Sequence, residues 1–168
     1  MSDPDLLIRR WHVLHVHPRC EKKIADTART LGLSHYLPLR SATKIYQRRK
    51  VTVGKPVFPG YCFVSFDWEG RLELLKTNQI ARFLVPPSQR QLLHQLAQIR
   101  RALRVDPTLA IEQSLDAGTR VRIATGPFMG VEGLVAEIKG ISKVLLNVEM
   151  IGQAVALEVR RDFLEILD

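Results

Sequence analysis

Three histidines lie close together near the start of the chain, and their side chains could bind a metal ion. They fall within residues 11–17, an alternating stretch that predicts a β-strand closed by Pro18. In such a strand His15 and His17 share one face, and His12 lies on the other. No further ligand follows at the spacing of a metal site. We therefore expect partly exposed polar histidines at a strand end, and neither a bound metal nor a cofactor.

The residue types that redox chemistry or catalysis would need are not arranged for it. Cys20 and Cys62 lie far apart in the sequence, without the spacing of a metal clip or a redox pair. The glycines within residues 126–133 lack the Lys-Ser or Lys-Thr pair of a phosphate-binding loop. We find no nucleophile elbow and no carboxylate pair at catalytic spacing. The sequence predicts a cytoplasmic protein with reduced thiols that is not an enzyme.

Charge is divided unevenly along the chain. Residues 1–104 carry 19 Lys and Arg against 7 Asp and Glu, a net charge of +12, whereas residues 105–168 carry 6 against 10, a net charge of −4. This asymmetry indicates two modules with different partners, although solvated surfaces of unlike charge would give the same count. The acidic residues 1–5 show no signal-peptide pattern, and no apolar run approaches the roughly 18 residues that span a bilayer. We expect no membrane contact.

The first hundred residues predict an antiparallel sheet with helices packed on it. In the second helix we expect Leu72 and Leu75 to be turned inward. The predicted helices cover residues 19–31, Asp67 to about Thr77, and Ser88 to about Arg104; the predicted strands cover 11–17, 36–39, 61–66 and 80–85, with a hairpin over 43–53.

The predicted hairpin has a basic tip at Gln47-Arg48-Arg49, although the usual Asn-Gly turn signal is missing. From Arg40 to Lys50 five of eleven residues are basic and none is acidic. Cations on a projecting loop beside Tyr46 suit phosphate contacts, because each neutralised phosphate releases counterions. The alternative is a plain solvated loop.

The stretch from Lys55 to Phe66 begins with two prolines and a glycine and continues as a strand that is apolar on both sides. Tyr61 and Phe63 point one way, while Cys62, Val64 and Phe66 point the other. Such a strand is either central to its sheet or offers one face to a partner.

Residues 105–117 show no consistent period and predict a linker with at most one short turn. Beyond them, turn residues separate five short strand-like segments, a pattern typical of a small closed barrel. Glycines at positions 126, 130, 133, 140 and 152 would each cost about 1 kcal/mol inside a helix, which favours strands. The segments are 119–124, 131–138, 143–149, 154–160 and 163–167.

Two motifs, in this order, resemble the NusG family of transcription elongation factors. Trp11 opening the first strand, followed by Phe58-Pro59-Gly60-Tyr61, resembles the signature of the N-terminal (NGN) domain of that family. Residues 118–133 are similar to its C-terminal KOW motif. The resemblance implies an α+β fold: a ferredoxin-like NGN domain at 8–104, a linker at 105–117, and a five-stranded, SH3-like KOW barrel at 118–168.

The resemblance implies that the NGN domain binds RNA polymerase and bridges its DNA cleft. The contact with the β′ clamp helices would use His15, Phe58, Pro59, Tyr61, Phe63, Ile80 and Phe83. The contact with the β-subunit gate loop would use Arg71, Leu72 and Glu73.

The resemblance also implies contact with the non-template DNA strand and the upstream duplex. The matching positions are His17, Arg19, Lys23, Thr77 and Asn78, with Lys44, Arg48, Arg49 and Lys50 on the hairpin near the duplex. Phosphate contacts of this kind carry no sequence information by themselves.

In the family the KOW barrel recruits a small-subunit ribosomal protein or the termination factor Rho, here through Met150 and Ile151. Housekeeping members often carry an aromatic residue where Ile151 stands, so the sequence departs from the pattern for Rho. A specialised, RfaH-like antiterminator that acts as a monomer is the expected function. The alternative is a ribosome-associated KOW-type RNA-binding protein, whose barrel should be basic rather than acidic.

Overall fold

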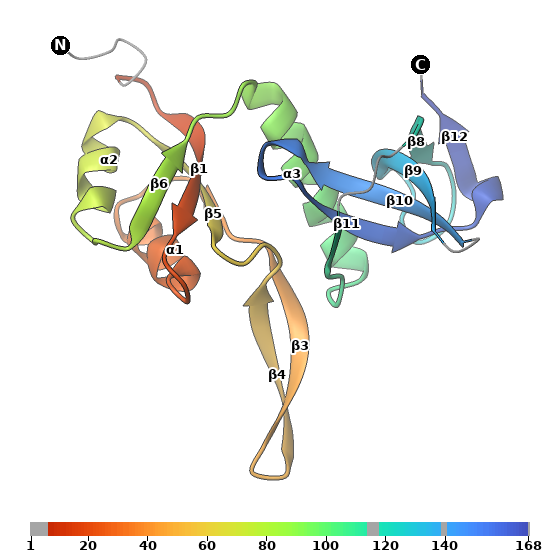
Figure 1. Ribbon diagram of the computed structural model, residues 1–168, viewed down its shortest axis with the longest axis horizontal. Coiled ribbons are helices and arrows are strands. Elements are labelled where there is room, and N and C mark those ends of the chain that lie inside the picture. The colour runs from red at the N-terminus through yellow and green to blue at the C-terminus, as the bar shows by residue number, and fades with distance from the viewer. Residues whose placement is uncertain (1–6, 114–117, 139–140, 168) are drawn as a thin grey trace. The chain divides into compact units, whose positions relative to one another are not determined.

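The computed structural model describes residues 7–113, 118–138 and 141–167. The chain forms two compact units (Figure 1): the first comprises residues 1–38 and 58–89, and the second comprises residues 39–57 and 90–168. Gly140, one of the glycines that favoured strands over a helix, lies outside the described residues. The fold is α+β with antiparallel sheets, as predicted.

The first unit is built on a four-stranded antiparallel sheet in the order β2-β5-β1-β6. The central strand β1 pairs with β5 on one side and with β6 on the other, which confirms three of the predicted strands. The short strand β2 extends the sheet beyond β5. The strands are β1 (Arg10–Val16), β2 (His35–Tyr36), β5 (Tyr61–Phe66) and β6 (Ile80–Leu84).

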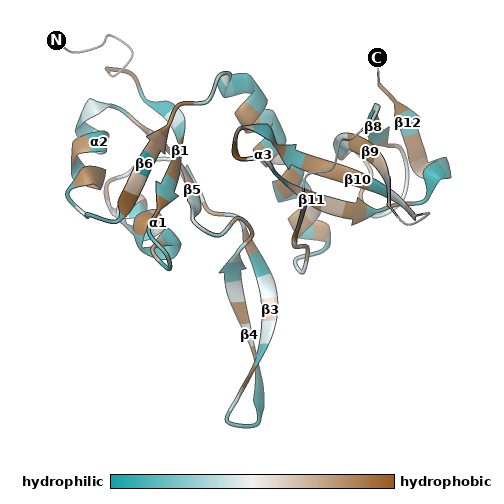
Figure 2. Cartoon of the chain, in the orientation of Figure 1, coloured by the Kyte–Doolittle hydropathy of each residue, from teal (hydrophilic) through white to brown (hydrophobic). Residues whose placement is uncertain are grey.

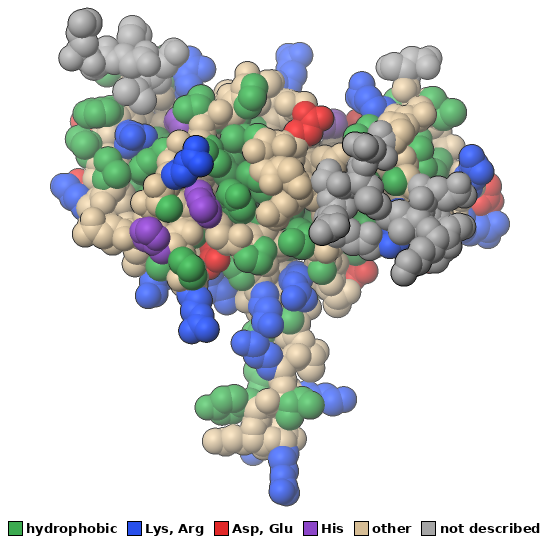
Figure 3. Space-filling model, viewed as in Figure 1, with side chains coloured by type: hydrophobic (Ala, Val, Ile, Leu, Met, Phe, Trp, Pro, Cys, Tyr) green, Lys and Arg blue, Asp and Glu red, His purple; other side chains and the backbone are tan. Residues whose placement is uncertain are grey.

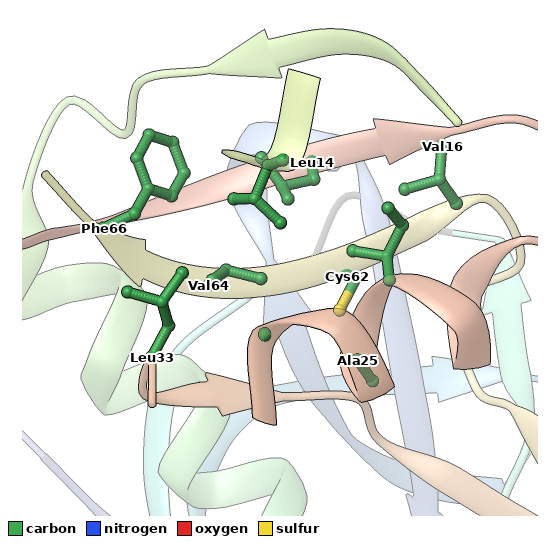
Figure 4. Close-up of a cluster of buried hydrophobic side chains, with 10 residues drawn as sticks. Leu14, Val16, Ala25, Leu33, Cys62, Val64 and Phe66 are labelled. Carbon is green, nitrogen blue, oxygen red and sulfur yellow. The ribbon is translucent and has the colours of Figure 1, made fainter. Parts of the chain in front are cut away.

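Two helices cover one face of this sheet, α1 (Glu21–Thr30) and α2 (Trp68–Leu75). Apolar side chains from β1, β5 and both helices pack between the layers, as the close-up in Figure 4 shows. The predicted inner face of β5 is confirmed, because its three members lie in this cluster. The buried members are Leu14, Val16, Ile24, Ala25, Ala28, Leu33, Cys62, Val64, Phe66 and Leu74.

Helix α2 begins as expected but presents a different face to the sheet. Asp67 caps it by accepting a hydrogen bond from the Gly70 amide at 2.9 Å. The expectation that Leu72 and Leu75 point inward is wrong, since they are 41% and 43% exposed whereas Leu74 is fully buried. A Cβ on Gly70 would lie 2.9 Å from the Cβ of Phe66, so this glycine permits the close approach that sets the buried face.

The second unit contains a six-stranded antiparallel sheet in the order β12-β8-β9-β10-β11-β7. Five of its strands match the five predicted segments. The sixth, β7, pairs with β11 and lies in the segment predicted to be a linker, so that part of the linker prediction is wrong. The strands are β7 (Ile111–Gln113), β8 (Arg120–Ile123), β9 (Glu132–Ile138), β10 (Ile141–Val148), β11 (Gln153–Glu158) and β12 (Leu164–Ile166).

Helix α3 (Gln89–Val105) is held to the second sheet by polar contacts. Gln98 Oε1 accepts from the Glu132 amide at 2.9 Å, and His94 Nε2 lies 3.3 Å from Glu132 Oε2. Gln91 Nε2 donates to Glu149 Oε2 at 2.9 Å. From the sequence we predicted that this helix belongs to the first module. In the structure, residues 90–105 of the helix belong to the second compact unit.

The predicted hairpin is present as a separate two-stranded sheet of β3 (Leu39–Tyr46) and β4 (Arg49–Pro56). Gln47 and Arg48 form its turn with φ angles of 47° and 64°. Positive φ at both central residues is the signature of a type I′ turn, usually made by Asn-Gly. Figure 2 shows this tip in the hydrophilic colour.

The expectation that all three histidines are partly exposed is wrong for His12, which is 8% exposed on the helix-covered face of the first sheet and stacked on Phe66 at 4.1 Å. Its Nδ1 lies 2.8 Å from the Arg10 carbonyl oxygen, to which it donates. Burial lowers the pKa of His12 below 6.5, and the nearby charges of Arg71 and Arg10 lower it further.

We predict that this histidine makes the first unit less stable in acid. A lowered folded-state pKa means that the unfolded chain takes up the proton first, so stability is lost as the pH falls below about 6.5. His12→Phe keeps a stacked ring and removes the titration. Between pH 7.5 and 5.5 the wild type should therefore lose about 1 kcal/mol more than this variant. Urea unfolding followed by tryptophan fluorescence measures the free energy of unfolding of both proteins at each pH. An identical pH dependence of the wild type and His12→Phe would contradict the prediction.

Candidate functional site

The sheet of the first unit has a second face, opposite α1 and α2. The register of the strands identifies the side chains that lie on it. Across the three strands, His15 lies opposite Tyr61 on β5 and opposite Arg82 on β6. Directly opposed residues of antiparallel strands share a face. Tyr61, His15 and Arg82 therefore form one row across the sheet, which we call the cross-strand row.

The cross-strand row is partly open to solvent. The rings of His15 and Tyr61 are half-buried and stacked, with centroids 5.2 Å apart, and Arg82 is exposed. An aromatic ring, an imidazole and a guanidinium held on a rigid sheet are typical anchors of a protein interface.

The two predicted interface phenylalanines are buried instead. Phe58 and Phe63 are 1% and 0% exposed, and their rings meet edge to face at 6.3 Å. Phe63 lies opposite Val13 in the register, which is also fully buried. Pro59, between Phe58 and Gly60, is exposed. In this conformation the two rings support the neighbouring surface rather than contribute to it.

Ile80 and Phe83 lie on the opposite face from Tyr61. Both pack against the core beneath α1 and α2, and Phe83 meets Phe66 edge to face at 5.6 Å. Val16 pairs with Ile80 whereas His15 pairs with Arg82, so Ala81 is an extra residue in β6, a β-bulge. The seven residues expected to form one polymerase-binding face therefore do not share a face. Arg82, which the bulge brings to the row, was not found from the sequence.

A turn at Gly60 positions this surface, and a buried carboxylate holds the turn. Glu21, 8% exposed at the start of α1, accepts a hydrogen bond from the Gly60 amide at 2.9 Å. The Gly60 carbonyl accepts from the Val16 amide at 2.8 Å. Gly60 has a φ of +88°, and a Cβ there would lie 3.6 Å from the His15 ring. Glu21 could not be found from the sequence, because nothing in its spacing relates it to Gly60.

The predicted gate-loop residues are consecutive on α2 and point in different directions. The Arg71 guanidinium lies 4.2 Å from the centre of the Phe83 ring. Leu72 is 41% exposed. Glu73 pairs with Lys76 at 2.7 Å. Only Leu72 offers an unengaged apolar side chain to a partner.

Five of the predicted DNA-binding residues gather near one end of the first sheet. The His17 amide donates to the Gln79 carbonyl at 2.8 Å, which brings the turn after β1 beside the turn before β6. Arg19 and Asn78 adopt positive φ angles of 64° and 56°, a strained conformation for non-glycine residues. The exposed members are His17, Arg19, Lys23 and Asn78, and Thr77 is half-buried.

The other four predicted DNA-binding residues are on the β3–β4 hairpin. Lys44, Arg48, Arg49 and Lys50 are all exposed. Figure 3 shows Lys and Arg side chains along the projecting hairpin, with hydrophobic side chains near its tip. Ile45 and Tyr46, 76% and 69% exposed, account for part of that apolar surface.

Two turns lie at the same end of the second sheet, because β8, β9, β10 and β11 run antiparallel in order. The β10–β11 turn carries Met150 and Ile151, the predicted partner-binding residues, which are half-buried. The β8–β9 turn carries Met129, which is 70% exposed and was missed from the sequence. Exposed methionine is common on protein-binding surfaces, so this residue extends the candidate contact.

Burial raises the pKa of the Cys62 thiol to about 12, so it stays protonated at neutral pH. Among residues 7–113, 118–138 and 141–167, no three His, Cys, Asp or Glu side chains group as metal ligands. No helix within the described part of the chain is long and apolar enough to cross a membrane.

The family model described as "Transcription termination factor nusG" matches residues 9–102, more than half of the chain. The chain belongs to the NusG family. The match covers the first sheet, the hairpin and most of α3, which includes both candidate interfaces of the N-terminal part. The family resemblance that the two sequence motifs indicated is thereby confirmed.

Full-length relatives extend the similarity to the rest of the chain. The "Transcription termination/antitermination protein NusG" of Deinococcus radiodurans is 28% identical, covering 89% of this chain and 94% of its own. The Borreliella burgdorferi protein of the same name is 24% identical, covering 90% and 95%. Among solved structures, "Domain interaction in Thermotoga maritima NusG" has a TM-score of 0.50 at 20% identity, covering 95% and 98%. The last of these shows similarity of fold alone.

We predict that the Glu21 carboxylate stabilises the Gly60 turn through its acceptor oxygen. Glu21→Ala leaves a buried amide without a partner and should lower the free energy of unfolding by about 1–3 kcal/mol. Glu21→Gln keeps an oxygen at the same reach and should cost clearly less. Urea unfolding followed by fluorescence measures both variants. If the two changes cost the same, the hydrogen bond to Gly60 is not what Glu21 contributes.

Proposed function

We propose that this NusG-family protein is a specialised antiterminator that binds RNA polymerase, contacts DNA and suppresses pausing or termination. One observation carries the proposal: relatives named transcription termination/antitermination proteins align along nine-tenths of the chain, through both the N-terminal sheet and the C-terminal strands. No chemical step is required. Binding energy that favours the elongating state of the polymerase is sufficient.

The docking surface for the β′ clamp helices is the cross-strand row together with Pro59. Its support is geometric, because the stacked His15–Tyr61 pair and the exposed Arg82 share one face of a sheet whose other face is packed. Phe58 and Phe63 are the buried support of this surface, and Ile80 and Phe83 are left outside it. The gate-loop contact is assigned to Leu72, flanked by Arg71 and Glu73.

The DNA contacts are assigned to two groups of cations and polar residues. The turn group of His17, Arg19, Lys23, Thr77 and Asn78 would meet the non-template strand, and the hairpin cations would meet the upstream duplex. Exposure of the cations supports both assignments. Phosphate contacts of this kind hold a factor on DNA without reading its sequence.

The C-terminal part is proposed to be a KOW barrel that recruits a second protein, a small-subunit ribosomal protein or Rho. Five strands in the predicted order and a core that includes Val121, Ile123 and Val144 support the barrel. Met150 and Ile151, with Met129 at the same end of the sheet, form the proposed contact. Domain bounds of 8–104 and 118–168, a monomeric state and a cytoplasmic location complete the proposal.

The alternative, a ribosome-associated RNA-binding protein, is less well supported. Its barrel would need a basic surface, whereas residues 105–168 carry a net charge of −4.

We expect the purified protein to shorten pauses and increase read-through when added to a bacterial RNA polymerase on templates that carry pause sites and terminators. Tyr61→Ala and Arg82→Ala should each weaken polymerase binding by roughly tenfold or more, because truncating a central anchor removes contact that its neighbours cannot replace. Transcription assays and titration of labelled polymerase measure the two effects.

Phe83→Leu is the matched control, since it keeps an apolar side chain on the opposite face of the same strand. It should leave polymerase affinity unchanged. Equal losses of polymerase affinity from Arg82→Ala and Phe83→Leu would show that β6 does not bind polymerase through the face that carries Arg82. A transcript pattern that is the same with and without the protein would refute the proposed antitermination function.

A further inference from the structure

Helix α3 has three sides, and two of them are engaged by the rest of the chain. One side is apolar and buried. A second side contacts the second sheet, where Gln98 Oε1 accepts from the Glu132 amide at 2.9 Å and Gln95 Oε1 accepts from the Glu149 amide at 3.2 Å. The third side, which we call the arginine side, carries the exposed cations of the helix. The buried members of the first side are Leu92, Leu96, Ile99 and Ala102.

The helical repeat brings the arginines together on one side. Arg90 and Arg101 are eleven positions apart, close to three full turns, and Arg104 lies fourteen positions from Arg90, close to four. These three residues therefore share a side of the helix, over a length of about 21 Å at 1.5 Å for each residue. Arg100 flanks them, one turn before Arg104. All four arginines are exposed.

The stability of the helix does not account for this arrangement. A cation near a helix C-terminus is favoured by the helix dipole, which explains Arg104 in the last turn. The same dipole disfavours Arg90 in the first turn, which carries no acidic residue. Arg100 and Arg104 repel each other at positions i and i+4, and no Asp or Glu lies between Gln89 and Val105 to offset the repulsion. The arginine side therefore destabilises the helix that carries it.

Exposed cations on the other helices have carboxylate partners. Arg29 pairs with Asp26 on α1 at 3.2 Å, and Lys76, after α2, pairs with Glu73 at 2.7 Å. Within residues 7–113, 118–138 and 141–167, by contrast, the four guanidinium groups of the arginine side form no ion pair and no hydrogen bond. Their donors are therefore open to an anionic partner from outside the chain.

We propose that the arginine side of α3 binds the phosphate backbone of a single RNA strand, which for a polymerase-bound factor is the nascent transcript. This inference goes beyond the contacts with polymerase and DNA in the proposed function, and the identity of the strand rests on that function. A guanidinium group holds a phosphate through two parallel hydrogen bonds and also stacks on an unpaired base. All four cations of α3 are Arg, and none is Lys.

The attachment of α3 favours a single strand over a duplex. The major groove of B-form DNA, about 12 Å wide, admits a whole α-helix, but α3 cannot enter it because two of its sides are engaged. The major groove of an RNA duplex is too deep and narrow for side chains to read. A row of cations along one side of a helix instead suits a strand that lies lengthwise on it. Leu93, 41% exposed and one turn from Arg90, offers an apolar contact to its bases.

The proposed function favours RNA over a DNA strand. Its DNA contacts are assigned to the turn group and to the hairpin, and the transcript is the remaining strand of an elongating polymerase. An acidic protein segment is the competing partner, since carboxylates also fit guanidinium groups. One residue type repeated over about 21 Å suits the regular repeat of phosphates better than the mixed side chains of a protein.

Glutamine substitutions test the arginine side, because glutamine removes the charge and is a good helix former. We expect Arg101→Gln to weaken binding of the full-length protein to a labelled uridine oligonucleotide by about fivefold at 0.1 M salt. The slope of log K against log salt should fall in magnitude by about 0.7, the value for one lost phosphate contact of a single strand. Arg90→Gln should act in the same way. The double variant should bind about twenty-five-fold more weakly, because one strand contacts both positions.

Arg29→Gln is the matched control, since it removes the same charge from another exposed helical position. It should weaken binding by less than about twofold, because Asp26 already pairs with Arg29. Fluorescence anisotropy over a series of salt concentrations measures all the variants, with an RNA duplex as a further probe. Equal losses from Arg101→Gln and Arg29→Gln would overturn the assignment to the arginine side. An RNA duplex bound as tightly as the oligonucleotide would overturn the assignment to a single strand.

A photo-crosslinking amino acid in place of Leu93 identifies the partner in a stalled elongation complex whose transcript and DNA strands carry different labels. We expect it to capture the transcript. Crosslinks to DNA in place of the transcript would overturn the assignment to RNA. Crosslinks to protein alone would overturn it as well and would assign the arginine side to an acidic protein surface.

Polymerase binding, measured on the same variants, separates this inference from the proposed function. Arg101→Gln should bind polymerase through the cross-strand row as the wild type does. If Arg90→Gln and Arg101→Gln leave the affinity for the oligonucleotide unchanged while polymerase binding is retained, the inference is wrong and the polymerase contact stands. If the wild type fails to bind polymerase, the proposed function fails, and the ratio of the Arg101 and Arg29 effects still decides whether the arginine side binds a strand.

Discussion

The hydrogen bond from the Gly60 amide to the buried Glu21 carboxylate is the contact on which the candidate polymerase-binding face depends. It ties the start of α1, which packs on one side of the sheet, to the turn that leads into β5. The Val16 amide ties the same turn to the end of β1. Gly60 is thus held from both sides, and the next residue, Tyr61, is placed against His15. A charge-assisted bond to a buried amide suits this role, because it is short, directional and costly to break.

The second constraint is the bulge at Ala81. A regular strand would keep Ile80 and Arg82 on one face, as alternate residues. The extra residue reverses the phase, so that Ile80 and Phe83 both pack into the helix-covered core while Arg82 and Leu84 face the other way. Bulges often re-aim a side chain beside a functional surface. Here the result is a cation beside the His15–Tyr61 pair, on a sheet whose packed core keeps the row rigid.

Much of the architecture could be predicted from the sequence. Periodicity and turn residues located α1, α2, α3, the hairpin and the five C-terminal strands, because each has a strong local signal. The errors have nonlocal causes. Leu74 rather than Leu72 faces inward because Gly70 approaches Phe66 closely, and β7 was missed because its partner β11 is some forty residues away.

The site was harder to predict than the fold. Motifs pointed to Tyr61 and the hairpin cations, which lie on exposed or half-exposed surface. They also pointed to Phe58 and Phe63, whose burial depends on packing that no local pattern reports. Arg82 and Glu21 were missed for related reasons: one reaches its place through a bulge, and the other through a contact between residues 39 apart in sequence. The arginine side of α3 was missed because only the structure shows that the other two sides of the helix are engaged.

The most direct test of this account is hydroxyl-radical footprinting of the free protein and of its complex with RNA polymerase. In the proposed complex, polymerase docks on the cross-strand row while Phe58 and Phe63 beneath it stay buried. We predict that oxidation of Tyr61 and His15 falls in the complex, and that Phe58 and Phe63 are oxidised little in either state. Unchanged oxidation of Tyr61, or a change at Phe63 on binding, would contradict the claim.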